Sequence, residues 1–273
     1  MGSLTNYLEA AFINHLCGTA FTPPATVYLA LATADPGEAA TGASMNEVAN
    51  SGSYARVAIA FGAAASRRVT QNAAVNFAQL TAALGTATHY AIVDSATYGA
   101  GNALAYGAFG VAKSLISGNS PSVASGEIYV EISATGSGAG FTNTLVHSML
   151  NLMLRNVAYS QPATYLGATT TVSSDSAAGT EVSGGSYARV LVNKAGGSSP
   201  AWATVSGGAT SLANAVSLPV ATAAWGTLVS SAIYDAATSG NMLVYDNNTA
   251  DQAVATADTW QWVAGEWDLG PLS

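Results

Sequence analysis

The chain has 273 residues and a net charge of −8, and only 8% of its residues are charged while 49% are hydrophobic. Seven basic residues, spread along the chain, form no basic patch, so we expect no nucleic-acid partner. No apolar run approaches the roughly 18 residues of a membrane span, so we expect no membrane partner. The N-terminus lacks signal-peptide features. The single cysteine, Cys17, excludes an intrachain disulfide and a cysteine-rich metal site.

The first predicted element is an amphipathic helix near the N-terminus. Ser3 or Thr5 is suited to cap its start, and Gly18 is suited to end it. Its predicted buried stripe follows the spacing of one helix face and consists of Leu4, Tyr7, Leu8, Ala11, Phe12, His15 and Leu16. A second helix is predicted within 141–155, and its apolar residues cover more than one face. We therefore expect the other half of the chain or a neighbouring subunit to enclose the second helix.

Each helix is followed by short predicted strands separated by Gly, Asn and Ser turns. Residues 26–31 alternate as a strand should, and residues 164–167 are their weaker counterpart. Because no helix interrupts the later strands, a parallel βαβ sheet is excluded and an antiparallel sandwich or barrel is favoured. The apolar stripe of each helix should lie against one sheet or across one end of it.

A repeated motif indicates a tandem duplication. Tyr54-Ala55-Arg56-Val57 recurs as Tyr187-Ala188-Arg189-Val190, and a Glu-Val pair precedes each copy. Later landmarks recur in the same order, among them Ala91-Ile92-Val93-Asp94 with Ala232-Ile233-Tyr234-Asp235, and Gly101-Asn102 with Gly240-Asn241. The predicted fold is mainly β, with two tandem antiparallel β-sandwich (jelly-roll-like) domains, each preceded by an amphipathic α-helix. The predicted domains are residues 1–133 and 141–273, joined by a Gly-rich linker at 134–140.

The repeated arginines are the first candidates for a site, because arginine is scarce in this chain. Tyr54 and Arg56 stand two positions apart on a predicted strand and should point to the same face. A structural interpretation pairs each arginine with a repeated acid, either Asp94 and Asp235 or Glu47 and Glu181. A functional interpretation is an anion or glycan site. We favour the structural one, with a repeated motif of Tyr54, Arg56, Asp94, Tyr187, Arg189 and Asp235.

All five tryptophans lie in the second half of the chain. Trp260 and Trp262 alternate along one predicted strand, so their rings should share a face, and Trp267 is assigned to the next strand. Exposed, these three rings would stack on sugars or form the centre of a protein interface. Buried, they would fill the core, and we favour this second interpretation.

No catalytic constellation stands out. His15, His89 and His147 do not repeat and lack the spacing of metal ligands, and no serine lies in a nucleophile elbow. Paired carboxylates of the glycosidase type stay open, although the repeated acids would then imply two active sites. We expect a protein that is not an enzyme, with no catalytic residue, cofactor or metal.

Together these motifs resemble a known family. The N-terminal helix, the Glu-Val pair and the Tyr-Ala-Arg-Val stretch, followed by Trp225-Gly226-Thr227, are similar to the phage virion module commonly named phage tail fibre protein. The resemblance covers nearly the whole chain, twice. The first copy departs from the pattern because it lacks the tryptophan before Gly85, and the second because Ser174-Asp175-Ser176 replaces the Asp-Pro-Gly loop.

This resemblance implies a structural protein located in the virion of a tailed phage. The first expected function is that of a capsid decoration (cement) protein, which binds the assembled major-capsid shell and stabilises it. Its expected partners are the major capsid protein or other virion proteins, and its expected assembly is a homotrimer. The alternative is a tail-fibre or tail-tip protein that binds a host receptor or glycan. The absence of coiled-coil or collagen-like repeats modestly favours decoration.

Overall fold

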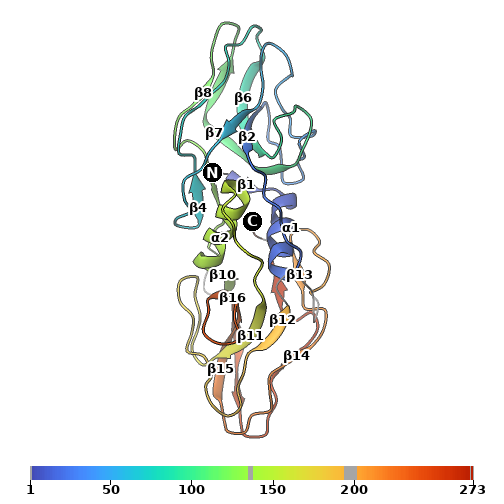
Figure 1. Cartoon of the computed structure of the whole chain (residues 1–273), viewed down its shortest axis with the longest axis vertical. Helices are drawn as coiled ribbons and strands as arrows, with labels where there is room; N and C mark the ends of the chain where they lie inside the picture. The colour runs from blue at the N-terminus through green and yellow to red at the C-terminus, as the bar shows by residue number, and fades with distance from the viewer. Residues whose placement is uncertain (1, 135–137, 194–201, 271, 273) are drawn as a thin grey trace.

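The computed structural model describes residues 2–134, 138–193, 202–270 and 272. The described chain is mainly β and forms two modules, which we call module 1 (residues 2–134) and module 2 (residues 138–272). The modules lie at opposite ends of an elongated molecule, with both helices between them near its middle (Figure 1).

The two modules contain the same series of described elements: a strand, a helix and eight further strands. Module 1 has β1 (Gly2–Leu4), α1 (Asn6–Cys17), β2 (Val27–Ala32), β3 (Val57–Ile59), β4 (Arg68–Thr70), β5 (Val75–Asn76), β6 (Gly85–Val93), β7 (Ala103–Leu115), β8 (Ser122–Val123) and β9 (Tyr129–Glu131). Module 2 has β10 (Ala139–Phe141), α2 (Asn143–Arg155), β11 (Thr164–Thr169), β12 (Val190–Asn193), β13 (Thr210–Ser211), β14 (Val216–Ser217), β15 (Gly226–Tyr234), β16 (Met242–Val254), β17 (Gln261–Trp262) and β18 (Asp268–Leu269).

Five strands form the central sheet of each module in the same order. The order is β3-β2-β6-β7-β1 in module 1 and β12-β11-β15-β16-β10 in module 2, and neighbouring strands are antiparallel. In module 1, β9 and β4 extend this sheet through one parallel contact between Gly2 and Val130. Their counterparts β18 and β13 form a separate pair in module 2. The predicted class, two tandem and mainly antiparallel β domains with a helix near each start, is confirmed.

Some local predictions need correction. Strands β1 and β10 were not predicted, and β10 begins at Ala139, inside the segment interpreted as linker; residues 135–137 of that segment lie outside the described residues. A three-residue strand is too short to show alternation, and these two strands form by pairing with β7 and β16. Tyr54 and Arg56 lie in a segment without regular secondary structure directly before β3, rather than within a strand.

Both helices begin and end as their sequences indicate. Thr5 is the N-cap of α1 and accepts a hydrogen bond from the backbone of Leu8, while Gly18 ends the helix in the left-handed region with φ 118°. Thr142 caps α2 in the same way. The predicted stripe of α1 is wrong at Tyr7, which is 41% exposed. The buried residues of this helix are Leu8, Glu9, Phe12, Ile13, His15 and Leu16.

Helix α1 contacts module 2 as well as its own sheet. The rings of Phe12 and Phe141 meet edge to face with centroids 5.3 Å apart. His15 is held by both ring nitrogens: Nε2 lies 3.1 Å from the carbonyl oxygen of Tyr159, and Nδ1 accepts the backbone N–H of Phe21 at 3.0 Å. These contacts join the two modules along α1.

Helix α2 contacts module 1 in return. Its His147 Nε2 accepts the backbone N–H of Arg67 at 3.0 Å, and its Asn151 accepts the N–H of Ala64 at 3.0 Å. The main cluster of buried hydrophobic residues includes side chains of both modules and both helices. One continuous core therefore runs through the junction, and the expectation that the other half of the chain encloses the second helix is correct.

We expect acidification to loosen this junction. Burial lowers the pKa of His15 and of His147 below the ordinary 6.5, and the charge of Arg67 adds to the effect at His147. A histidine with a lowered folded-state pKa binds more protons when unfolded, so stability is lost as the pH falls from 6.5 through the folded pKa. Protonation would also cost His147 its role as acceptor for Arg67.

The measurement is the thermal unfolding midpoint between about pH 7.5 and about pH 5. The midpoint should fall in this range, and the fall should be smaller in a His15→Gln/His147→Gln double variant. His89 lies in β6, away from the helices, so His89→Gln is the matched control and should keep the full pH dependence. An undiminished pH dependence in the double variant would contradict the assignment.

Candidate functional sites

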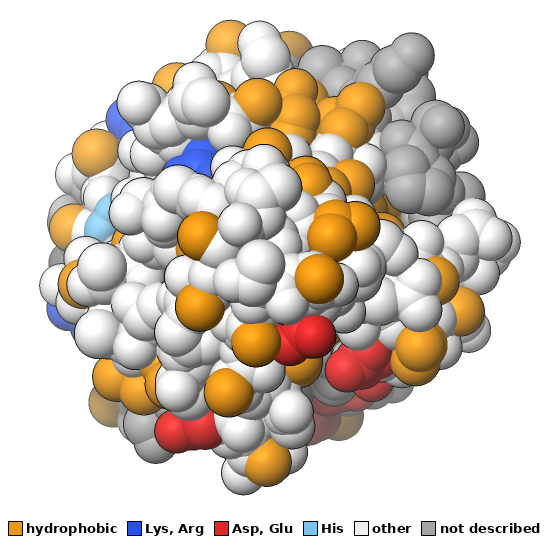
Figure 2. All heavy atoms as spheres, turned by 90° about the horizontal axis from the view of Figure 1, so that it is seen from below, with side chains coloured by type: hydrophobic (Ala, Val, Ile, Leu, Met, Phe, Trp, Pro, Cys, Tyr) orange, Lys and Arg blue, Asp and Glu red, His pale blue; other side chains and the backbone are white. Residues whose placement is uncertain are grey.

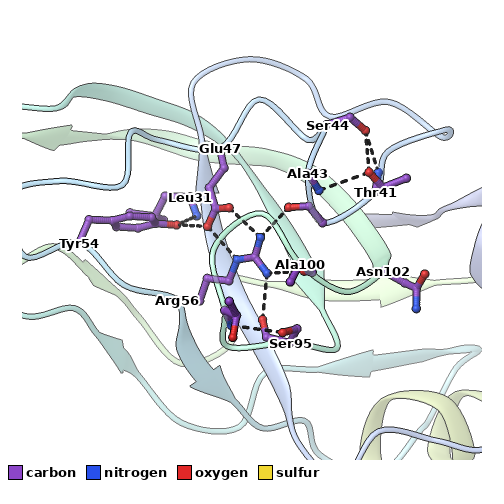
Figure 3. Close-up of polar contacts among 12 residues, drawn as sticks. Leu31, Thr41, Ala43, Ser44, Glu47, Tyr54, Arg56, Ser95, Ala100 and Asn102 are labelled. Carbon is purple, nitrogen blue, oxygen red and sulfur yellow. Dashed lines mark hydrogen bonds and ion pairs between the residues drawn. The ribbon is translucent and has the colours of Figure 1, made fainter.

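The repeated arginine of module 1 lies at the centre of a buried polar cluster (Figure 3). Arg56 donates to both carboxylate oxygens of Glu47, from Nε at 2.9 Å and from Nη2 at 2.8 Å. Its remaining N–H groups donate to the carbonyl oxygens of Gly42 (2.7 Å), Ser95 (3.0 Å) and Ala100 (2.8 Å). All five guanidinium donors therefore have acceptors within the protein.

Tyr54 completes this cluster. Its hydroxyl donates to Glu47 Oε1 at 2.9 Å and accepts the backbone N–H of Leu31 in β2 at 3.0 Å. Burial, together with the neighbouring Glu47 charge, raises the pKa of Tyr54, so the hydroxyl keeps its proton. The side chains of Arg56 and Glu47 are 0% and 5% exposed. No surface is left for an external anion, and the cluster ties two loops of module 1 to the sheet.

Module 2 repeats the cluster in a more open form. Arg189 donates to both oxygens of Glu181 at 2.7 Å and to the carbonyl oxygens of Ala236 and Ser239. Tyr187 donates to Glu181 Oε1 at 2.9 Å. The guanidinium also lies 3.5 Å from the ring centroid of Tyr234, a cation–π contact. Glu181 is 29% exposed, so this ion pair is partly solvated.

The repeated aspartates, Asp94 and Asp235, bond to asparagines in a turn rather than to the arginines. Asp94 accepts the backbone N–H and the side-chain amide of Asn102, both at 2.7 Å, and Asp235 does the same with Asn241. Each aspartate closes the turn between the two long strands of its module. Gly101 has φ +79°, and any side chain there would collide with Asp94. Of the two alternatives for the arginine partner, the structure therefore has the glutamates.

The tryptophans of module 2 differ in their surroundings. Trp262 and Trp267 are only 3% and 2% exposed, so their rings belong to the core rather than to a surface platform. Trp260 is partly exposed and packs edge to face on Trp262, with ring centroids 6.1 Å apart. Of the three residues singled out for an interface, Trp260 alone keeps an appreciable surface.

A hollow of about 300 Å³ opens beside Trp260. Polar side chains of the long strand β16 form one wall, among them Asp246, Asn248 and Gln252, and Glu266 stands on the other side. Sequence reasoning did not single out these residues. The signal available was that six of the seven side chains at 246–252 are polar, within a 13-residue strand whose counterpart in module 1 is less polar.

Two features are absent from the described residues. No group of three or more His, Cys, Asp or Glu side chains among them is arranged to hold a metal ion. None of the helices in the described ranges is long and apolar enough to cross a membrane. The histidines are engaged separately, His15 and His147 at the junction and His89 beside the hydroxyl of Thr88.

The fold and the repeated clusters define a duplicated, mainly β protein whose repeated polar residues hold loops together. The chain belongs to the family described as Podophage GP4 fiber I protein gp80, whose sequence model matches residues 3–131 and again residues 140–270. The two matches coincide with module 1 and module 2, so the chain carries two copies of this domain. A comparison with curated proteins found no match. The family indicates a structural protein of a phage particle, as the resemblance implied.

Proposed function

We propose that this chain is a non-enzymatic structural subunit of a phage fibre. The observation that carries the proposal is that two copies of a fibre-family domain lie end to end around one continuous core (Figure 1). An elongated subunit with a packed junction suits a projecting appendage, because it resists bending between its two ends. The family description, which contains the word fiber, supports the same assignment.

The partners we propose are other virion proteins and further copies of this chain, assembled as a homotrimer. The surface is suited to contacts with other subunits, because charged side chains are sparse among hydrophobic and uncharged ones at the module 2 end (Figure 2). Large apolar side chains are also exposed on both modules, among them Val111 and Ile116 in module 1 and Val220 and Val263 in module 2.

A capsid decoration protein is the second candidate. The charge-poor surface, with 8% charged residues in the chain, favours it as much as it favours a fibre, because a cement protein also buries its surface against neighbours. The elongated shape favours the fibre. In either case the protein would be part of the virion.

Immunogold electron microscopy of purified particles tests this proposal. Antibodies raised against the folded chain should label the tail region of intact particles and should leave tail-less heads unlabelled. Even labelling over the heads, together with a gain in heat resistance when the purified chain is added to bare capsids, would replace the fibre proposal with decoration.

A further inference from the structure

The two modules serve as internal references for each other, because their strands share one register. Ser231 pairs with Asp246 between β15 and β16 as Tyr90 pairs with Gly107 between β6 and β7. The same registers align Asn248 with Phe109 and Gln252 with Lys113. The small strand pairs align similarly, since Leu218 bonds to the carbonyl of Trp260 as Phe77 bonds to that of Pro121. The hollow of module 2 can therefore be compared position by position with module 1.

In module 1 this place is filled by large side chains. Tyr90 and Phe109 are buried with ring centroids 5.2 Å apart. Lys113 lies over the Phe109 ring, 5.4 Å from its centroid, and pairs with Glu127 at 2.6 Å. Two rings thus occupy the interior, and an ion pair covers them.

In module 2 the same positions carry short or uncharged side chains. Ser231 replaces Tyr90 and Asn248 replaces Phe109, and both shorter side chains line the hollow. Trp267, which replaces Ile128, takes up part of the interior and donates from Nε1 to Ser231 Oγ at 3.3 Å. Gln252 replaces Lys113 and cannot form an ion pair with Glu266, the counterpart of Glu127. The result is the hollow of about 300 Å³, near the lower limit of ligand-binding pockets.

The walls of the hollow combine one accessible aromatic ring with several hydrogen-bonding groups. Trp260 presents part of an indole ring, while Asp246, Gln252 and Glu266 present carboxylate and amide groups. A pyranose sugar has the matching surface, an apolar C–H face surrounded by hydroxyl groups that donate and accept hydrogen bonds. An apolar peptide side chain would leave these polar walls unsatisfied.

The negative charge of the hollow restricts the class of sugar that it can bind. Burial, and then the charges of Glu266 and Asp268, raise the pKa of Asp246, so negative charge is already crowded here. No lysine or arginine lines the hollow within the described part of the chain. Anionic sugars would therefore be repelled, whereas neutral hydroxyl donors would be accepted.

A second hollow of about 280 Å³ adjoins the first and shares Asp246, Glu266 and Trp267 as walls. It extends to Ala139–Phe141 of strand β10. Two adjoining hollows with common walls offer room for linked sugar units rather than for a single one.

We infer that module 2 is a glycan-binding module that takes a neutral hexose oligosaccharide, with one ring on Trp260 and hydroxyl groups bonded by Asp246, Gln252 and Glu266. The inference deepens the proposed function and rests on it for the biological setting, because a fibre would meet such a glycan on the surface of its host. Binding itself is a property of the purified chain.

Saturation-transfer NMR on the purified chain, with a panel of neutral hexose disaccharides and their sulfated analogues, tests the inference. At least one neutral disaccharide should bind, and its sulfated analogue should not. Trp260→Ala should weaken binding at least about tenfold. Gln252→Lys restores the ion pair of module 1 across the mouth of the hollow and should abolish binding. The matched control, Lys113→Gln in module 1, should leave binding unchanged.

Gln252 is exposed, so Gln252→Lys should keep the melting midpoint, and this separates loss of binding from loss of folding. The inference is overturned if no neutral disaccharide of the panel binds, if sulfated analogues bind better, or if binding survives both Trp260→Ala and Gln252→Lys. Immunogold labelling is independent of these results, so a failed glycan experiment and a failed fibre assignment are distinguishable.

Discussion

Glu47→Ala is expected to destabilise the chain by about 3–5 kcal/mol, the cost of leaving a buried charge without its partner. Arg56 would keep its positive charge in a site where its side chain is fully buried, and the hydroxyl of Tyr54 would lose its acceptor. Glu181→Ala removes the equivalent carboxylate from a partly solvated pair, so water replaces it and the loss should be nearer 1 kcal/mol. Urea-induced unfolding followed by tryptophan fluorescence and circular dichroism measures both.

Glu38→Ala is the control for Glu47→Ala, because Glu38 lies in the same loop of module 1 and is exposed. It should change stability by less than about 0.5 kcal/mol. Equal effects of Glu38→Ala and Glu47→Ala would refute the structural role of the cluster. So would an Arg56→Ala variant with unchanged melting that has lost binding to the virion, because Arg56 would then be a contact residue.

Arg67→Ala is expected to make the two modules unfold in separate transitions. The Arg67 side chain is buried at the junction, where its donors reach carbonyl oxygens of Ile132 (3.0 Å) and Phe141 (2.7 Å), and it lies 3.4 Å from Asp175. Alanine would leave these buried carbonyl oxygens without their donor, at a cost of about 1–3 kcal/mol for each unsatisfied group. We expect one calorimetric transition in the parent chain and two in the variant.

Arg68 is the matched control for Arg67, since it is the next residue and exposed, with its guanidinium 5.1 Å from the ring centroid of Tyr129. Arg68→Ala should keep the single transition. Limited proteolysis gives a second measurement, because a loosened junction should speed cleavage in the segment 134–140. A single transition in Arg67→Ala, or two transitions in both variants, would show that Arg67 does not couple the modules.

Much of the fold was predictable because the duplication presents the same sequence pattern twice, so that each copy supports the assignment of the other. The caps Thr5 and Gly18 and the antiparallel class follow from local rules. Tyr54 and Arg56 do meet at Glu47, although they precede β3 instead of lying within a strand, as the alternation rule had assumed. The acid that pairs with Arg56 was not predictable, because Glu47 and Asp94 both recur in the second half. Only the folded loops show that Glu47 approaches the guanidinium while Asp94 closes a turn.

The candidate site was also predictable from the sequence only in part. Alternation correctly placed Trp260 and Trp262 beside each other, but it carries no information on which ring reaches the surface. The hollow depends on Ser231 in β15 and Asn248 in β16, whereas Trp260 directly precedes β17. The strand register shows that these two residues replace the rings of Tyr90 and Phe109. The periodicity of the sequence does not provide that register.

The number of copies of this chain per particle tests the fibre assignment most directly. Quantitative mass spectrometry of purified virions, with the major capsid protein as internal reference, provides it. A fibre subunit at the tail should be present in a few dozen copies at most, in a number set by the symmetry of the tail. Hundreds of copies, in fixed proportion to the capsid protein, would contradict the account and identify a protein of the shell.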